Sequence, residues 1–529
     1  MNAILKESHA GELVEADEFF APTPYGLIDG LFGQYHAMRA RVERLASLMD
    51  DENGVALGYF KTGNANDDHR FPDAGQLFRV GPALKALDAD FWQRTLNLTD
   101  VYNAMPQKRR DEWNESIREL KTPEFTEDNV SATMEALMAA RGQFLAERVD
   151  GIFRGLSGEH VTNSPMAFGK RMILSYVFSE WGGTNSSKCG LVNDLRCIIA
   201  KFMGRDEPYW NASDAMLRAC MERHGEWHVV DGGALRVRAY LKGTVHMEVH
   251  PEMAWRLNAI LANLYPRVIP ASFRTKPPKK AKTFTMMGRP LPFAVLAILS
   301  GCMVRGTNDA SLGYCEEFEI KPARKEALRV LESIGGVRQS DITVRFNYDP
   351  RDVLREIHVS GCVPDKVSHQ YYPTPENVAR VAVDMLDAGE LGDCTFLEPS
   401  AGQGAIASLL PPDFTQCVEI SGLHCMILRA KGYQCEQADF IAWAAQAMCE
   451  GNLFDRVCMN PPYSDGRWLA HLQAAVSLLA PGGRVVCILP ASQRGKDLIP
   501  GLDYEWSEVF ANQFAGTSID VAIYAGSKA

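Results

Sequence analysis

Apolar side chains recur every three or four positions over much of residues 1–150. The segments "LIDGLFGQYHAMRARVERLASLM" and "TEDNVSATMEALMAARGQFLAERVDGIF" show this spacing most clearly, and it is the spacing of one face of an α-helix. From residue 151 to about 285 the pattern is mixed, and "WHVVDGGALRVRAYLKGTVHMEVH" alternates as paired strands do on either side of a Gly-Gly turn. We therefore expect a mainly helical region at 1–150 and an α+β region at 151–285.

Residues 286–365 predict a small module of short helices and strands. The run "LPFAVLAILSGCMV" is apolar and uncharged but too short to span a bilayer, so it predicts a buried helix. An amphipathic helix is expected in "ARKEALRVLESIGG", and a strand pair in "ITVRFNYDPRDVLREIHVSG". This order is compatible with a winged-helix-like module.

Short apolar strands and helical stretches alternate regularly over residues 366–529. Such alternation is typical of a parallel sheet with helices on both faces, a doubly wound, Rossmann-like α/β domain. In these sheets ligands bind at the carboxyl ends of the strands, so the residues that follow each strand are the first candidates for a site. The predicted strands are "CTFLEP", "TQCVEI", "YQCEQADF", "DRVCMN" and "RVVCILP".

The length of the chain, its cysteines and its first residues predict the number of domains and the cellular location. A chain of 529 residues exceeds one ordinary core and should form three or four domains. Its 13 cysteines include no CxxC pair, which favours reduced thiols over disulfides or a zinc ribbon. The first residues, "MNAILKESHAGELVEADE", lack the basic and apolar parts of a signal peptide. We expect a cytoplasmic protein that does not enter a membrane.

The net charge of −11 is unevenly distributed. Residues 371–529 hold 9 Lys and Arg against 18 Asp and Glu, a net −9, which leaves −2 for the rest of the chain. A polyanionic partner would therefore need cations from the region upstream. The stretch 267–282 is rich in proline and basic residues and holds no acid, as either a phosphate-binding loop or a solvated linker would. Its candidate DNA-binding residues are Arg274, Lys276, Lys279, Lys280 and Lys282.

Three strand ends carry candidate ligand-binding residues. The first strand runs into "LEPSAGQG", where small residues and glycines permit a tight turn and the close approach of a ligand, although such turns serve several ligands or structure alone. The second ends in Glu419, which could accept hydrogen bonds from a ribose or be an exposed strand-end carboxylate. The third ends in Asp439 and Phe440, an acceptor for an adenine amino group beside a ring that could cover its face.

The fourth strand ends in Asn460-Pro461-Pro462-Tyr463. An amino group conjugated with an aromatic ring is a poor nucleophile because its lone pair is delocalised. The Asn460 side-chain oxygen and the Pro461 carbonyl could bind both N–H bonds and draw the nitrogen towards tetrahedral geometry, which exposes that lone pair. Tyr463 could stack on the ring. A structural proline turn is the alternative, but this position at a strand end favours a catalytic loop.

In this order the motifs resemble a known family. Residues 371–529 resemble S-adenosylmethionine-dependent DNA adenine-N6 methyltransferases of the gamma arrangement: "YYPTP", "LEPSAGQG", the acid Glu419, the pair Asp439 and Phe440, and "NPPY" all find counterparts. The resemblance implies a class I methyltransferase domain that uses S-adenosyl-L-methionine. The cofactor-binding residues that it implies are Tyr372, Thr374, Glu398, Pro399, Ala401, Gly402, Gly404, Glu419, Ile420, Asp439, Phe440 and Asn460.

The resemblance also implies a substrate and a mechanism. Phe514 lies six residues before an apolar strand, like the aromatic residue that stacks on a flipped base opposite Tyr463, and Phe510 is a rival for this role. Transfer would be direct and in line onto N6 of adenine in DNA, without a metal or a covalent intermediate. His246, Glu248 and His250 alternate in a predicted strand, but a structural or surface role is favoured there over metal binding.

Other substrates stay open at the level of sequence. "NPPY" also occurs in enzymes that methylate a glutamine side-chain amide and, in variant form, guanine N2 of ribosomal RNA, and a non-catalytic DNA-binding anti-restriction protein is a third class. Gamma enzymes usually carry a recognition domain after the catalytic one, whereas this sequence ends at Ala529. Recognition of double-stranded DNA is thus expected from the first 365 residues. These more loosely resemble an uncharacterised region joined to adenine methyltransferases of phages and mobile elements, which suggests protection against restriction.

Overall fold

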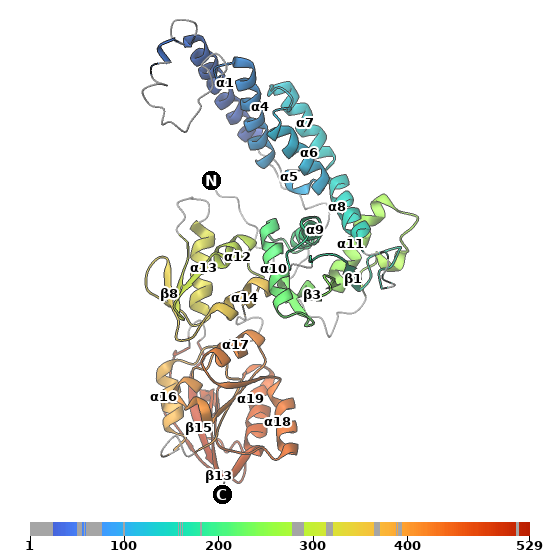
Figure 1. Cartoon of the computed structure of the whole chain (residues 1–529). Helices are drawn as coiled ribbons and strands as arrows, with labels where there is room; N and C mark the ends of the chain where they lie inside the picture. The colour runs from blue at the N-terminus through green and yellow to red at the C-terminus, as the bar shows by residue number, and fades with distance from the viewer. Residues whose placement is uncertain are drawn as a thin grey trace. The chain divides into compact units, whose positions relative to one another are not determined.

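The protein is described from a computed structural model (Figure 1). The chain divides into two compact units, one formed by Met1–Leu217 with Arg238–Lys282 and the other by Arg218–Val237 with Thr283–Ala529. Each unit contains more than one of the four regions expected from the sequence, whose boundaries stay predictions. The structure describes residues 25–49, 55–57, 59, 77–98, 101–156, 158, 160, 162–179, 182–277, 290–313, 321–363, 371–387, 389, 394–514 and 518–528.

The first part of the first unit is helical, as the apolar spacing predicts. The helix α7 begins where the Thr126 side chain accepts a hydrogen bond from the amide of Asn129, beside acidic residues that suit a helix N-terminus, and it buries Val130 and Met134. The rings of Tyr35, Phe91 and Phe125 pack together in the core. The helices are α1 Tyr25–Leu48, α4 Val80–Asn97, α5 Val101–Ala104, α6 Gln107–Arg118, α7 Glu127–Ala139 and α8 Arg141–Gly155.

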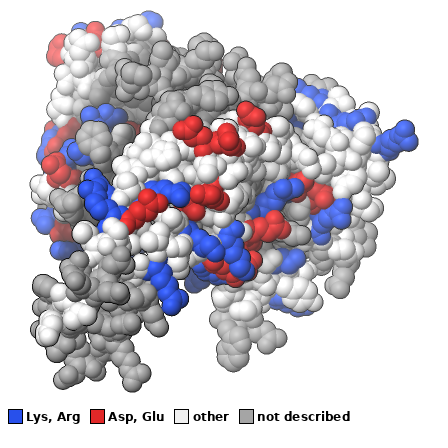
Figure 2. Space-filling view, turned by 90° about the horizontal axis from the view of Figure 1, so that it is seen from above, with Lys and Arg blue, Asp and Glu red and all other residues white. Residues whose placement is uncertain are grey.

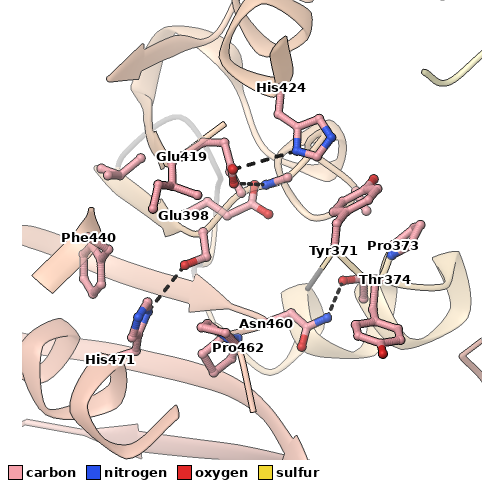
Figure 3. Close-up of a pocket in the computed structure, with 18 of the residues that line it drawn as sticks. Tyr371, Pro373, Thr374, Glu398, Glu419, His424, Phe440, Asn460, Pro462 and His471 are labelled. Carbon is pink, nitrogen blue, oxygen red and sulfur yellow. Dashed lines mark hydrogen bonds and ion pairs between the residues drawn. The ribbon is translucent and has the colours of Figure 1, made fainter. Parts of the chain in front are cut away.

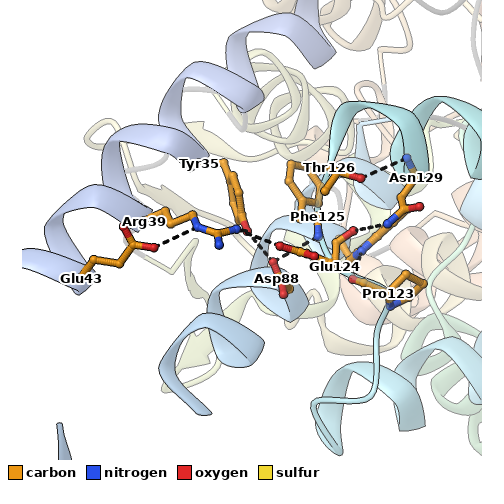
Figure 4. A network of polar contacts seen from close by, with 10 residues as sticks. Tyr35, Arg39, Glu43, Asp88, Pro123, Glu124, Phe125, Thr126 and Asn129 are labelled. Atoms are coloured by element: carbon orange, nitrogen blue, oxygen red, sulfur yellow. Dashed lines mark hydrogen bonds and ion pairs between the residues drawn. The ribbon is translucent and has the colours of Figure 1, made fainter. Parts of the chain in front are cut away.

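A buried carboxylate joins α1 and α4 to the loop before α7 (Figure 4). Asp88 accepts hydrogen bonds from the Tyr35 hydroxyl at 2.6 Å and from the Phe125 amide at 3.2 Å. Burial and the bond to Asp88 raise the pKa of Tyr35 to about 12. Arg39 contacts both the Tyr35 hydroxyl and Glu124. The network satisfies the polar groups that packing of this helical core would otherwise leave without partners.

The rest of the first unit combines helices with a strand pair. β1 and β4 run antiparallel, with Arg171 opposite Glu248. Buried Arg148 on α8 contacts Asp194 on α9 at 2.7 Å, and this carboxylate also binds Arg110, so charge is compensated inside the unit. The helix α10 and the strand β3 each include residues of both units. The elements are β1 Arg171–Leu174, α9 Ser186–Phe202, α10 Trp210–Glu222, β3 Leu235–Ala239, β4 Val245–Val249, α11 Pro251–Leu264 and η3 Ala271–Phe273.

The second unit contains a helix–hairpin module, the name used here for residues 290–313 and 321–363. Helix and hairpin occur twice in succession, and the four strands form an antiparallel sheet in the order β5-β6-β8-β7. Earlier in the chain, β2 His228–Val230 pairs with β3 around the expected Gly-Gly turn, η2 Asp231–Gly233. The module consists of α12 Phe293–Ser300, β5 Met303–Arg305, β6 Asp309–Ser311, α13 Lys321–Ser333, β7 Val337–Arg338, β8 Thr343–Arg345 and α14 Arg351–Ser360.

One expectation for this module is wrong. The segment predicted as a strand pair contains one strand, β8, followed by the helix α14. Val353, Leu354 and Ile357 are buried on one face with the spacing of a helix. The apolar and polar residues that alternate at 357–360 are what favoured a strand. The apolar run 291–304 contains α12, whose core-facing residues are buried as expected.

The rest of the second unit contains a seven-stranded sheet in the order β11-β10-β9-β12-β13-β15-β14. The neighbours from β11 to β13 are parallel, and β15 is antiparallel to both β13 and β14. All five strands that the sequence predicted here are present. The strands are β9 Phe396–Pro399, β10 Thr415–Glu419, β11 Gln434–Gln437, β12 Phe454–Met459, β13 Leu479–Pro490, β14 Asp503–Trp506 and β15 Val521–Ser527.

Helices cover both faces of this sheet, which confirms the predicted α/β architecture (Figure 1). Leu397, Val418 and Val457 pack against buried residues of α18 and α19, whereas Phe396 packs with α16 and Cys417 with α17 on the opposite face. Within the described parts of the chain, no helix is long and apolar enough to cross a membrane. The remaining elements are α16 Glu376–Asp384, α17 Gly422–Ala430, α18 Phe440–Glu450, α19 Arg467–Ser477, η6 Ala407–Leu409, η7 Pro412–Phe414, η8 Ser464–Gly466 and η9 Ala491–Gln493.

Candidate active site

A cavity of about 660 Å³ lies where β9, β10 and β12 end. It brings together segments that are far apart in the sequence (Figure 3). Pro399 and Gly404 are predicted cofactor residues that do not line it; Pro399 is buried in β9, and a Cβ on Gly404 would lie 2.7 Å from Leu428. The predicted residues that line the cavity are Tyr372, Thr374, Glu398, Ala401, Gly402, Glu419, Ile420, Asp439, Phe440, Asn460, Pro461, Pro462, Tyr463 and Phe514.

The Asn460 side chain is oriented by two hydrogen bonds. Its Nδ2 donates to Thr374 Oγ1 at 3.1 Å, and its Oδ1 accepts from the Tyr463 hydroxyl at 3.0 Å. A donor partner on one side and an acceptor partner on the other determine which way the amide plane is turned. The Tyr463 hydroxyl also lies 3.2 Å from the Ile488 carbonyl oxygen, so its proton is shared between two acceptors. Asn460 therefore presents a fixed amide oxygen beside the cavity.

Tyr463 and Phe514 belong to the same apolar region beneath this loop. Tyr463 and Phe510 pack against a buried cluster that includes Phe514, which is only 5% exposed. Burial raises the pKa of Tyr463, so the hydroxyl keeps its proton and remains a donor to Asn460. Both rings line the cavity, and the role of Phe514 as a second stacking partner stays a prediction.

The glycine loop after β9 is held by the acid at the end of β10. Glu419 accepts hydrogen bonds from the amides of Gly402 and Ser421, both at 2.8 Å. Burial opposes ionisation of Glu419, but neighbouring His424 and these amide bonds outweigh it and lower its pKa. Gly402 has φ +57°, and a Cβ there would lie 2.6 Å from the Tyr371 ring. The loop backbone is thus pressed against Tyr371 in a conformation that only glycine adopts readily.

Asp439 and Phe440 have structural duties besides the predicted contacts with an adenine. Asp439 caps α18 by accepting a hydrogen bond from the Ala442 amide at 3.1 Å. Phe440 is 3% exposed and packs 5.4 Å from the His471 ring. Both still line the cavity. An alanine at position 439 would remove a helix cap together with any ligand contact.

Several lining residues were missed at the level of sequence. His424 Nδ1 lies 3.8 Å from Glu419 Oε1, and its ring lies 4.4 Å from that of Tyr371. His471 Nδ1 lies 3.4 Å from Ser400 Oγ, and burial lowers the pKa of His471 despite nearby Asp439. Arg467 lies four residues before His471 on α19 and lines the same cavity. This i, i+4 spacing directly after "NPPY" is the signal that could have placed both on the face towards the site.

The structure describes parts of two other candidate sites, at 246–250 and at 267–282. Glu248 accepts hydrogen bonds from Arg171, and His250 caps α11 by accepting from the Glu252 amide. Among the residues described, no three His, Cys, Asp or Glu side chains are arranged to hold a metal ion. Arg274 and Lys276 are exposed after η3. Lys279, Lys280 and Lys282 lie outside the described residues.

Glu398 is a buried carboxyl group in the wall of this cavity. The carboxyl group is 2% exposed and accepts a hydrogen bond from the Ala407 amide at 2.7 Å. Burial raises its pKa from 4.5 to about 8, so the folded state prefers the protonated form. The stability that this group contributes is complete below pH 4.5 and is lost as the pH rises through about 8.

Glu398→Gln should remove this pH dependence, because glutamine keeps the acceptor for Ala407 and cannot ionise. As the pH rises from 6 to 9, we expect the melting temperature of the variant to increase relative to that of the wild type. Scanning fluorimetry over this range measures the gap between them, with the exposed Glu450→Gln on α18 as a matched control. A gap that stays constant for Glu398→Gln would show that Glu398 titrates as an ordinary carboxyl group.

Comparison with known proteins gives one family match and several structural likenesses. Residues 84–267 match a family described as a domain of unknown function, DUF4942. No curated protein matches the sequence. TrmN from Thermus thermophilus is 18% identical with a TM-score of 0.25, over 41% of this chain and 70% of that one. Likenesses at this level assign no substrate.

Two further solved structures are similar over a smaller share of the chain. Magnesium protoporphyrin IX methyltransferase from Synechocystis PCC 6803, with bound SAM, is 11% identical with a TM-score of 0.23, over 29% of this chain and 79% of that one. Precorrin-6y C5,15-methyltransferase from Geobacter metallireducens GS-15 is 18% identical with a TM-score of 0.23, over 29% of this chain and 88% of that one. Both of these proteins are methyltransferases by name.

Proposed function

We propose that this protein is an S-adenosylmethionine-dependent methyltransferase that acts on N6 of adenine in double-stranded DNA. The observation that carries the proposal is the oriented Asn460 amide, with Pro461 and Tyr463 beside it, on the same cavity as the glycine loop and Glu419. An amide oxygen and a main-chain carbonyl together accept from a planar amino group, and a flat ring nearby suits a base.

The residues present fit the cofactor that the proposal requires. Glu419 and Asp439 are acceptors for hydroxyl and amino groups, and both line the cavity. Ile420 is 57% exposed although it is apolar, so with Phe440 it offers a surface for a flat heterocycle. What the cofactor supplies when bound is an electrophilic methyl group on a sulfonium sulfur, which becomes a neutral thioether on transfer.

The chain's own contribution to the reaction is positioning and charge stabilisation. Asn460 Oδ1 and the Pro461 carbonyl oxygen accept hydrogen bonds from the two N6–H groups. These hydrogen bonds localise the nitrogen lone pair and stabilise the positive charge that develops on N6. The ring of Tyr463 stacks on the flipped base and keeps N6 in line for attack. After the N–C bond has formed, N6 releases one proton to water and becomes a neutral secondary amine.

Cations for the DNA backbone must come from outside residues 371–529, whose net charge is −9. In the helix–hairpin module most exposed arginines are compensated, for example Arg345 by Asp309 and Arg338 by Asp341. In the view of Figure 2, Lys and Arg side chains are interspersed with Asp and Glu. The acid-free stretch 267–282 is therefore our candidate for phosphate contacts.

Replacing its five candidate residues with alanine should weaken DNA binding to all sequences similarly and flatten the salt dependence, because lost phosphate contacts carry no sequence information. Fluorescence anisotropy with two unrelated duplexes at several salt concentrations measures both effects. A variant with wild-type affinity and salt slope would show that the stretch is only a linker. The substituted residues are Arg274, Lys276, Lys279, Lys280 and Lys282.

The substrate is tested by incubating the full chain with labelled cofactor and separate pools of duplex DNA, single-stranded DNA, ribosomal RNA and a release-factor-like protein. We expect label in DNA, recovered as N6-methyladenine after digestion to nucleosides. Label in the protein or the RNA would replace the proposal with one of the alternatives, and label in no pool would favour a non-catalytic DNA-binding protein. Resistance of methylated DNA to restriction enzymes then tests the protective role.

A further inference from the structure

The helix–hairpin module touches the glycine loop directly. Gln403 lies between the two glycines of that loop, and its Nε2 donates a hydrogen bond of 2.7 Å to the main-chain carbonyl of Ser333. Ser333 is the last residue of α13, where carbonyl groups have no partner within the helix. An orphan carbonyl at the end of one helix is thus satisfied by a side chain of the loop that lines the cavity.

A second contact holds the same residue from the other side. Lys431, which follows α17, donates to the Gln403 carbonyl oxygen at 2.8 Å, and its ammonium group lies 5.9 Å from the ring centroid of Tyr348 in the module. The Tyr348 hydroxyl in turn donates to the Ile334 carbonyl at 2.7 Å. Gln403 is therefore held through both its side chain and its main chain.

The glycine loop needs such support because of its conformation. Gly402 and Gly404, on either side of Gln403, have φ +57° and +78°, and glycine loses more conformational freedom on ordering than any other residue. Gly335, with φ +93°, brings the module close: a Cβ there would lie 3.5 Å from Gln403 Oε1. The module's turn at Gly335 thus lies against the side chain of Gln403, between the two glycines of the loop.

We infer that Gln403 is a positioning residue through which the helix–hairpin module orders the cofactor loop, so that the module forms part of the cofactor site. The inference rests on the proposed function, because it takes the cavity to be the S-adenosylmethionine site. It follows that residues 366–529 alone would bind the cofactor more weakly than the full chain. A partner that shifts α13 would also change cofactor affinity.

The test uses the full chain and isothermal titration with S-adenosylmethionine. Gln403→Ala should raise Kd about fivefold, the factor expected from the loss of one ordinary hydrogen bond, and it should raise the KM for the cofactor by a larger factor than it lowers kcat. Gln403→Glu should raise Kd as well, because it keeps the size but cannot donate to Ser333. Gln339→Ala is the matched control: its Nε2 also donates to a module carbonyl, that of Val337, but away from the loop.

Hydrogen exchange of the cofactor-free protein gives a readout that does not depend on binding or activity. Gln403→Ala should accelerate exchange at residues 400–407 and leave β12 and β13 unchanged. If the wild type binds cofactor and Gln403→Ala matches it in both Kd and exchange, the inference is overturned. If the wild type fails to bind cofactor, the proposed function fails, while faster exchange in the variant would still support the ordering role of Gln403.

Discussion

Asn460→Ala should lower kcat by a factor of about a hundred to a thousand while leaving the Kd for S-adenosylmethionine nearly unchanged. The amide oxygen beside the cavity acts mainly when positive charge develops on N6, and the loss of one such preorganised acceptor is expected to cost roughly that much. Single-turnover methylation of duplex DNA measures the rate of the chemical step, and isothermal titration measures cofactor binding.

Asn460→Asp is the matched variant for this experiment. It keeps an acceptor for N6–H and for the Tyr463 hydroxyl but loses the donor to Thr374 Oγ1, so its loss should be smaller than that of alanine. Near-normal turnover of Asn460→Ala would remove this residue from catalysis. A large loss of cofactor affinity in both variants would show that Asn460 serves the cofactor instead.

The second large effect is expected at Tyr463, where two substitutions separate two roles. Tyr463→Ala removes the ring and should lower kcat/KM roughly a hundredfold, because stacking on a base contributes about 1–3 kcal/mol and Asn460 also loses a hydrogen bond. Tyr463→Phe keeps the ring and removes only the hydroxyl group, which donates a hydrogen bond of 3.0 Å to Asn460 Oδ1. The kcat/KM of this variant should fall about tenfold, mainly through kcat, because the side-chain amide of Asn460 can then rotate.

The base analogue 2-aminopurine, placed at the target adenine, gives an independent readout of these roles. Its fluorescence increases when the base leaves the duplex stack, and stacking on Tyr463 should quench it again. Tyr463→Phe should keep the wild-type signal, whereas Tyr463→Ala should give a brighter one. If phenylalanine and alanine behave alike in both rate and fluorescence, the hydroxyl rather than the ring carries the function of this residue.

The sequence alone determined the local elements of the catalytic region and the chemistry at their ends. All five predicted strands between residues 394 and 490 are present, since short apolar runs bounded by turns leave little choice of structure. Because parallel strands end at a common edge of the sheet, Glu398, Glu419 and Asn460 could be placed near one another before any contact was known. The motif order supplied the proposed cofactor and substrate.

Tertiary structure decided the contacts between residues far apart in the chain. The bond from Gln403 to Ser333 and the packing of Tyr371 on His424 leave no local signal, because each depends on how separate elements pack. The same holds for α14, where burial selected a helix from a segment whose pattern also suited strands. Side-chain chemistry was thus readable from the sequence, whereas the partners that orient those side chains depend on long-range packing.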